Sequence, residues 1–345
     1  MKISENPIYL SELSGICDKL LGKNGVFLVT GASGLIGSCV VDLLMYANQH
    51  CKSNFKVYAL SRNLKKMESR FSYIKNKDWI SYIAQDICDP LAKRYHYDYI
   101  IHAASNADPK MYSLFPAETL LTNIYGTKNV LDYCVSHKKT KVLLTSSFEV
   151  YGHIDNADYY SEENSGITNI NQIRSSYPES KRCAELLLRC YYQEYGVNGV
   201  IARLSSVYGP AMTVNDSKAH AQFIRNAINN KNIVLKSAGT QKRTYTYIID
   251  TIDALLTVLF YGVPGEAYNI SNENSIATIA EVAQTIAEIS ETKVVFDSPE
   301  EIEKRGYSNP QDCVLSNDKL RQLGWRGQYT LKDGLEHTIK ILMEM

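Results

Sequence analysis

The sequence has no surplus of positive charge. Its 345 residues include 37 Lys plus Arg and 37 Asp plus Glu, so the formal net charge is +0. Binding to a nucleic-acid backbone needs a surplus of cations that face the phosphates, so we expect no nucleic-acid partner. No apolar run reaches the length of a membrane span, and the N-terminal stretch has no basic region followed by an apolar one. We therefore expect no membrane segment and no secretory signal.

Metal-binding and disulfide patterns are also missing. The eight cysteines are scattered without a CxxC pair, and the seven histidines show neither HxH nor HExxH spacing. This distribution predicts no metal site and argues against a disulfide framework. A reducing compartment, the cytoplasm, fits it best.

What the sequence does contain is an alternation of short β-branched runs with longer segments of helical periodicity. The runs lie at 26–30, 56–60, 80–84, 98–104, 141–147 and 199–204. This alternation predicts an α/β fold, a doubly wound parallel sheet with helices on both faces. Ligands bind such sheets beyond the carboxyl ends of the strands.

The same pattern divides the chain into parts. Residues 1–24 carry apolar side chains at helical spacing and are expected to form a helical extension packed on the body. Residues 25–204 would form the sheet domain, and residues 245–262, a strand and a helix, would return to it. The rest of 205–345 is expected to form a smaller C-terminal lobe.

The first loop of the sheet carries three glycines. Gly31, Gly34 and Gly37 lie directly after the first strand and at the start of a helix. The first permits a tight turn, the second lets the backbone approach a pyrophosphate, and the third lets helix and strand pack closely. Because a helix N-terminus offers free N–H groups to an anion, the loop predicts a dinucleotide site in a Rossmann-like fold.

The second strand ends without the acidic residue that holds a free ribose 2′-hydroxyl. It ends in Ser61, and Arg62 follows. An arginine pairs well with a 2′-phosphate, although it could equally lie over the adenine ring. We therefore expect a tightly bound NADP or NAD, with NADP favoured.

Tyr177 and Lys181 lie one helical turn apart, and Pro178 between them is tolerated where a helix begins. A phenol is a poor base at neutral pH, but a nearby ammonium stabilises the phenolate and lowers its pKa. Because the chain has 25 tyrosines, this spacing alone decides little.

The pair belongs to a longer series of motifs. TGASGLIG, DICD (86–89), HAAS (102–105), TNIYGT (122–127), TSSFEVYG (145–152), YPESK, RLSSVYGP (203–210) and QKRTYTYIID (241–250) follow in this order. In these motifs, from about Val26 to its C-terminus, the chain resembles the extended short-chain dehydrogenase/reductase family, the NAD(P)-dependent nucleotide-sugar epimerases and dehydratases. The resemblance implies an enzyme that holds a nucleotide sugar in its smaller lobe and works through a 4-keto-sugar intermediate.

The resemblance also implies roles for single residues. Ser147 would hydrogen-bond the sugar hydroxyl that is oxidised, Tyr177 would take its proton, and Lys181 would bind the nicotinamide ribose while tuning Tyr177. Arg243 would hold the nucleotide diphosphate, and Ser206, an Asn in many relatives, would lie at the substrate. The expected cofactor-binding residues are Gly31, Ser33, Gly34, Leu35, Ile36, Gly37, Ser61, Arg62, Asn63, Asp86, Ile87, Ala103, Ala104, Ser105, Asn123 (largely structural), Tyr177 and Lys181.

Residues 148 and 149 bear on the step that follows oxidation. Glu149 resembles the Glu of sugar-nucleotide dehydratases and decarboxylases and could move a proton next to the ketone. Phe148 departs from the dTDP-glucose dehydratases, which have an acidic residue there, because Phe cannot protonate a leaving hydroxyl. The first expectation is a sugar-nucleotide 4,6-dehydratase. A UDP-glucuronate decarboxylase-type enzyme, a nucleotide-sugar 4-epimerase and a non-catalytic cofactor-binding protein stay open as alternatives.

The long helical segments 117–136 and 179–195 suggest how two subunits could meet. By analogy with the relatives, they would lie on one face and pair with their copies, so we expect a homodimer.

Overall fold

The computed structural model describes residues 2–155, 157–299 and 311–345. The strands of its main sheet are β1 (Asn24–Thr30), β2 (Asn54–Ser61), β3 (Ile80–Ala84), β4 (Tyr99–His102), β5 (Lys141–Ser147), β6 (Asn198–Leu204) and β10 (Ala267–Ile270). They form a seven-stranded sheet in the order β10-β6-β5-β4-β1-β2-β3, and every neighbouring pair runs parallel. The strand order reverses between β1 and β4, so a crevice opens beyond their carboxyl ends, where doubly wound sheets bind ligands.

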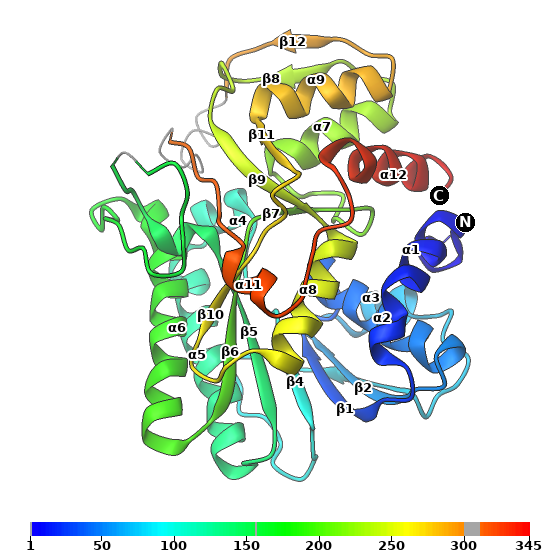
Figure 1. Cartoon of the computed structure of the whole chain (residues 1–345), viewed down its shortest axis with the longest axis vertical. Helices are drawn as coiled ribbons and strands as arrows, with labels where there is room; N and C mark the ends of the chain where they lie inside the picture. Colours follow the sequence, from blue (N-terminus) through cyan, green and yellow to red (C-terminus); the bar gives the residue numbers. More distant parts are fainter. Residues whose placement is uncertain (1, 156, 300–310) are drawn as a thin grey trace.

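The helices are α1 (Pro7–Cys17), α2 (Leu35–His50), α3 (Leu64–Arg70), α4 (Pro109–Leu114), α5 (Pro116–Ser136), α6 (Ser176–Tyr195), α7 (Ala219–Ile228), α8 (Ile248–Tyr261), α9 (Ile279–Ile289), α11 (Asp318–Gln322) and α12 (Leu331–Met343). Helices α5 and α6 lie side by side on one face of the main sheet, while α2 and α8 lie on the other (Figure 1). Because successive side chains of a strand point to opposite faces, Leu28 of β1 packs with the α5 and α6 side, and Phe27 and Val29 pack with the α2 and α8 side. The predicted doubly wound α/β fold is confirmed.

The N-terminal residues form α1 where the sequence predicts a helical extension. The Asn6 side chain accepts hydrogen bonds from the backbone N–H groups of Ile8 and Tyr9 at 2.9 and 3.4 Å, which caps the first turn. The buried side chains of Leu13 and Ile16 join the core on the α2 and α8 side. The extension is therefore packed into the body along one stripe of its surface.

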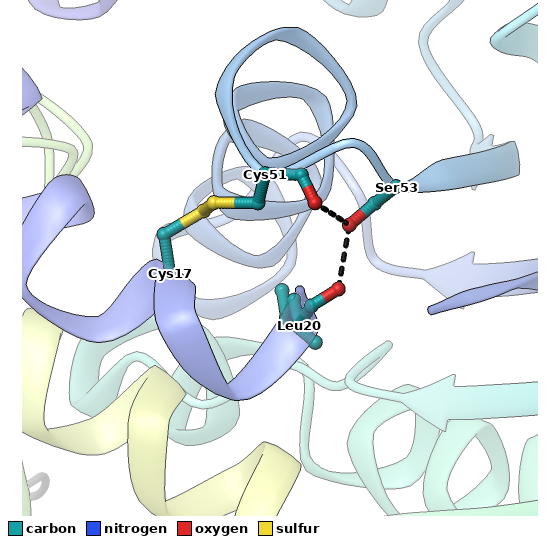
Figure 2. The surroundings of a disulfide bond; sticks show 4 residues. All are labelled: Cys17, Leu20, Cys51 and Ser53. Carbon is teal, nitrogen blue, oxygen red and sulfur yellow. Dashed lines mark hydrogen bonds between the residues drawn. A yellow bond between two sulfur atoms is a disulfide. The ribbon is translucent and has the colours of Figure 1, made fainter. Parts of the chain in front are cut away.

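A disulfide ties this extension to the sheet domain. Cys17, the last residue of α1, bonds to Cys51, which follows α2, across a sequence separation of 34 residues (Figure 2). The Ser53 hydroxyl donates to the carbonyl oxygen of Leu20 at 2.6 Å beside it. The expectation of cysteines without disulfides is wrong for this pair. No spacing motif marks the pair, and the folded chain brings its Cα atoms to 6.6 Å.

The smaller lobe contains β7 (Ser206–Tyr208), β8 (Ile233–Leu235), β9 (Lys242–Tyr247), β11 (Ile276–Thr278) and β12 (Val294–Phe296). They form a three-stranded sheet, β11-β9-β7, and a two-stranded sheet, β12-β8, beside α7 and α9 (Figure 1). Residues 300–310 of the predicted lobe lie outside the described residues. Among the described residues, no helix combines the length and the apolarity that a membrane crossing requires.

The predicted return of residues 245–262 to the main sheet is half correct. Helix α8 packs on that sheet, but the strand before it belongs to β9, which pairs with β7 and β11 instead. The chain adds its seventh parallel strand later, where β10 pairs with β6. Strand β10, whose four residues are all buried, was not marked in the sequence analysis.

Candidate active site

The glycine loop joins β1 to α2 at the strand-order reversal. Gly31 has a φ of +67°, and a Cβ there would lie 2.7 Å from the carbonyl oxygen of Ala103. A Cβ at Gly37 would lie 2.5 Å from the carbonyl oxygen of Gly31. Both positions therefore need glycine for the close packing of loop, helix and neighbouring strand.

The start of α2 fits an anionic group. Gly34 is its N-cap, and within the described chain no side chain caps it. The backbone N–H groups of Leu35 and Ile36, the first two helical residues, therefore have no partner within the helix. A pyrophosphate is the group that such a terminus, preceded by a glycine loop, is suited to bind.

The carboxyl end of β2 lies beside the glycine loop. The hydroxyls of Ser33 and Ser61 are 2.9 Å apart and share a hydrogen bond. The Arg62 guanidinium donates to the Glu118 carboxylate at 2.9 Å and lies 3.8 Å from the Asp86 carboxylate. The arginine that the sequence analysis assigned to a 2′-phosphate is thus already paired with two carboxylates.

Three other expected cofactor-binding residues make contacts within the protein. Asn63 accepts a hydrogen bond from the Lys66 N–H at 2.9 Å and so caps α3. Ile87 is buried against Gly126, because a Cβ added to Gly126 would lie only 2.9 Å from the Ile87 side chain. The Asn123 side chain donates to the Ser180 hydroxyl at 2.8 Å, a bond that joins α5 to α6.

Residues 103–105 follow β4 directly. The N–H groups of Ala103 and Ala104 both donate to the Thr30 hydroxyl at 3.2 Å. The Ser105 hydroxyl is buried and has no hydrogen-bond partner in the described part of the chain. A buried polar atom left unpaired beside a glycine loop fits a site that a polar ligand completes.

Of the four expected catalytic residues, Ser147, Glu149 and Tyr177 interact beyond the carboxyl end of β5, and Lys181 lies one turn along α6 from Tyr177. Ser147 is the last residue of β5, and its hydroxyl accepts a hydrogen bond from the Glu149 N–H at 3.2 Å. Tyr177 and Lys181 come from the first turns of α6, and both side chains are buried. The Ser147 side chain hydrogen-bonds Tyr177, and the Lys181 ammonium donates to the Thr145 carbonyl at 2.9 Å.

The electrostatics differ in part from the expectation that Lys181 tunes Tyr177. Burial raises the pKa of the Tyr177 phenol well above its usual value, and the Glu149 carboxylate raises it further. The groups that lower this pKa are the Ser147 side chain, through its hydrogen bond, and the Arg174 charge. Burial lowers the pKa of Lys181 to about 8, against an opposing effect of the Glu185 carboxylate.

A pocket opens next to this group. Phe148, Glu149, Arg174, Pro178 and Arg243 lie among its lining residues. The Arg243 guanidinium sits 5.3 Å from the centroid of the Phe148 ring, in cation–π contact. It therefore faces the pocket from β9, as a residue that holds the substrate would.

In the described part of the chain, neither Ser147 nor Ser206, two of the three expected substrate residues, lines this pocket. Ser206 lies in the smaller lobe. It is the first residue of β7, where it pairs with Tyr245 of β9.

Sequence reasoning missed two residues of the site. Arg174 binds the Glu149 carboxylate with both guanidinium nitrogens, at 2.7 and 2.9 Å. The Tyr112 ring from α4 stacks on the Tyr177 ring at a centroid distance of 4.9 Å and an interplanar angle of 17°. Arg174 could have been noticed as a cation three residues before Tyr177, whereas no motif marks Tyr112.

The fold and this site define a class of protein: a dinucleotide-binding α/β protein that carries a Ser at the carboxyl end of a sheet strand and a Tyr and a Lys at the start of a helix. Residues 27–271 match the NAD dependent epimerase/dehydratase family, to which the chain belongs. The resemblance drawn from the sequence motifs is confirmed.

Relatives of known activity cover almost the whole chain. UDP-glucuronic acid decarboxylase 6 from Arabidopsis thaliana is 32% identical over 330 residues, 92% of this chain and 88% of the relative. The dTDP-D-glucose 4,6-dehydratase from Homo sapiens is 29% identical over 322 residues, 91% of this chain and 88% of the relative.

A solved structure supports the fold in the same way. UDP-glucuronic acid 4-epimerase from Bacillus cereus, in complex with UDP-glucuronic acid and NAD, superposes with a TM-score of 0.78 at 23% identity. The match covers 92% of this chain and 99% of the epimerase.

Proposed function

We propose that the protein is an NAD-dependent nucleotide-sugar enzyme that removes the carboxylate of a nucleotide-linked uronic acid through a 4-keto intermediate. Its relatives include UDP-glucuronic acid decarboxylases, 4,6-dehydratases and 4-epimerases, so nucleotide-sugar chemistry with internal redox is common to all of them. The observation that carries the choice among these reactions is the pair of residues after β5, Phe148 and Glu149.

The chain's residues suit oxidation of a sugar hydroxyl. A bound nicotinamide would accept hydride from the sugar C4 and later return it. The Ser147 hydroxyl would hold the C4 hydroxyl, and Tyr177 would take its proton and give it back at the end. Arg243, which also lines the pocket, would pair with the diphosphate of the nucleotide.

After the oxidation, decarboxylation requires few further groups from the protein. In a 4-keto uronic acid the carboxylate is β to the ketone. The electrons of the breaking C5–carboxylate bond therefore pass into an enolate as carbon dioxide leaves, and C5 then takes a proton. No acid is needed for a departing hydroxyl. This agrees with Phe148, which lies under the Arg243 guanidinium and has no proton to give.

A 4,6-dehydratase, the first expectation from the sequence, is the second candidate. Glu149 favours it, because its carboxylate lies close enough to Tyr177 to raise the pKa of that phenol and could take a proton from C5. However, the same carboxylate is held by two hydrogen bonds from Arg174, and Phe148 leaves the departing hydroxyl without an acid beside it. We therefore place decarboxylation first.

Product mass tests the proposal directly. The purified protein with NAD is incubated separately with UDP-glucuronate and with UDP-, GDP-, CDP- and dTDP-hexoses, and the nucleotide sugars are weighed by mass spectrometry. The proposal expects loss of carbon dioxide from UDP-glucuronate alone. Loss of water from a hexose would establish the dehydratase, and an unchanged mass with a new isomer would establish an epimerase. No turnover of any substrate would refute an enzymatic role on nucleotide sugars.

We propose NAD as the working cofactor, in place of the NADP that the sequence favoured. Support comes from Glu118 and Asp86, whose carboxylates lie at Arg62 and would repel a 2′-phosphate. Calorimetric titration with NAD and NADP tests this choice. Tighter binding of NADP by the unaltered protein would refute it, and Glu118→Gln should raise the affinity for NADP.

We further propose a homodimer through α5 and α6. Leu121 and Tyr125 of α5 and Leu186 of α6 are large apolar side chains exposed on these helices. A second copy would cover them. Light scattering at micromolar concentration should give twice the chain mass, and Leu186→Glu should reduce it to one chain. A single-chain mass for the unaltered protein would refute the dimer.

We propose the cytoplasm as the location of the protein, and the Cys17–Cys51 disulfide provides a test of this proposal. Disulfides are rare in a reducing compartment. Mass spectrometry of protein isolated with its free thiols alkylated at once would show whether the bond exists in the cell.

A further inference from the structure

Arg174 lies between the residues of the site without belonging to the expected set. It sits in a 3₁₀-helix, Ile173–Ser175, that leads into α6. Its guanidinium binds Glu149 bidentately at 2.7 and 2.9 Å, and the two side chains are only 16% and 13% exposed. Two parallel bonds fix the plane of a carboxylate as well as its position, which a single lysine bond cannot do.

The same guanidinium also reaches the ring beneath Tyr177. Its carbon lies 5.5 Å from the centroid of the Tyr112 ring, and a nitrogen donates weakly to the Tyr112 hydroxyl at 3.4 Å. Tyr112 in turn stacks on Tyr177. Arg174 thus contacts two of the side chains that influence Tyr177, namely Glu149 and Tyr112.

The charges that face Tyr177 come from several elements. The Glu149 carboxylate after β5 raises the pKa of the phenol, and the Arg174 charge before α6 lowers it. Ser147 at the end of β5 lowers it through a hydrogen bond, and Tyr112 on α4 stacks on the ring. Lys181, one turn along α6, donates to the Thr145 carbonyl.

This balance of negative and positive charge around the Tyr177 phenol matters only if the phenol has to lose its proton. A buried carboxylate beside a phenol disfavours the phenolate, since two negative charges would then share one small site. A cation bound to that carboxylate offsets part of the repulsion.

We propose that Arg174 is a positioning residue of the reaction: it fixes Glu149 beside Tyr177 and offsets its charge, so that the phenol can give up its proton. The proposal rests on the nucleotide-sugar function above, because that reaction needs Tyr177 as a base. It deepens that function by adding a residue that acts through Glu149 and Tyr177.

A titration of Tyr177 in the NAD-loaded protein tests this without any substrate. The ultraviolet absorbance of tyrosinate is followed with pH, and the curve of the matching Tyr177→Phe protein is subtracted each time, which isolates residue 177. In Arg174→Gln the midpoint should rise by about one pH unit. In Glu149→Gln it should fall, and in the double variant it should return close to the midpoint of the unaltered protein.

A matched control and a conservative variant complete the set. The control is Arg182→Gln. Arg182 is a partly buried arginine in α6 that donates to the Glu179 carboxylate and to the Val150 carbonyl, and its replacement should leave the midpoint of Tyr177 unchanged. Arg174→Lys keeps the charge without the bidentate geometry. It should keep the midpoint near that of the unaltered protein and lower the turnover of a nucleotide uronic acid by roughly tenfold, in kcat more than in KM. If Arg174→Gln does not fold, a midpoint in Arg174→Lys above that of the unaltered protein contradicts the proposal.

The two proposals can fail separately. An unchanged midpoint in Arg174→Gln, or a raised midpoint that persists in the double variant, would overturn the role of Arg174 even if the protein decarboxylates its substrate. Shifted midpoints in a protein that turns over no nucleotide sugar would confirm the effect of Arg174 on the proton of Tyr177 and overturn the function proposed above.

Discussion

Replacing Lys181 should make the protein more stable at neutral pH while abolishing its function. The side chain is 4% exposed, and burial lowers its pKa from 10.5 to about 8. Below that value the ammonium is charged both in the folded chain, where it is buried, and in the unfolded chain, where water surrounds it. Folding therefore carries the full desolvation penalty of the charge at neutral pH.

The sign and size of the effect follow from linkage. Because the folded pKa lies below the unfolded one, the unfolded chain binds more protons between pH 8 and 10.5, and stability rises with pH across that window. The whole shift corresponds to about 3 kcal/mol, at about 1.4 kcal/mol per pH unit. As the pH rises from about 7 to about 9.5, Lys181 loses its proton in the folded chain, and the folded state becomes more stable by about 2 kcal/mol.

Lys181→Met removes the desolvation penalty of the buried ammonium and nearly keeps the volume of the side chain. In urea unfolding of nucleotide-free protein, the stability of Lys181→Met relative to the unaltered chain should therefore fall by about 2 kcal/mol from about pH 7 to about pH 9.5. Other groups that titrate in this range are common to both proteins and cancel.

The control for this measurement is Lys128→Met, which removes a half-exposed lysine of α5 and should show no such pH dependence. If the stability difference between Lys181→Met and the unaltered chain is the same at both pH values, the reasoning about the buried ammonium is wrong.

Three further changes test other contacts. Tyr177→Phe should lower turnover by roughly 10²- to 10⁴-fold while calorimetry finds the affinity for NAD unchanged, and full activity would end its assignment as the base. Cys17→Ser with Cys51→Ser opens a covalent loop of 34 residues and should lower the free energy of unfolding by about 4 kcal/mol in urea; an unchanged midpoint would show that the bond does not form. Glu185→Gln takes the charged partner from the buried Arg203, 2.8 Å away, and should lower stability by about 3–5 kcal/mol, so a loss below about 1 kcal/mol would contradict a buried ion pair.

Much of the fold could be read from local patterns. The six β-branched runs that the sequence analysis marked all became strands of the main sheet, because a strand buried on both faces needs a continuous apolar stretch of its own. The seventh strand was missed. Its four residues, Ala267–Ile270, are buried because β6 and α8 cover them, which no local pattern reveals.

The site was predictable to a smaller extent. The motifs located Ser147, Tyr177 and Lys181, since each lies at the end of a strand or the start of a helix that the sequence also marks. Their mutual influence was not predictable in the same way. Lys181 was expected to act on Tyr177, yet its ammonium binds the Thr145 carbonyl, and the cation beside the Glu149 carboxylate is Arg174.

The order of strands and helices, the glycine loop and the family were all determined by the sequence itself, because periodicity, turns and short motifs act between residues close together in the chain. Only the tertiary structure decided that Cys17 meets Cys51, that Arg62 is shared by two carboxylates, and that Arg174 faces Glu149. Each of these contacts joins residues 20 or more positions apart on different elements. Their distances depend on how helices and loops pack on the finished sheet, and that packing is a property of the whole chain.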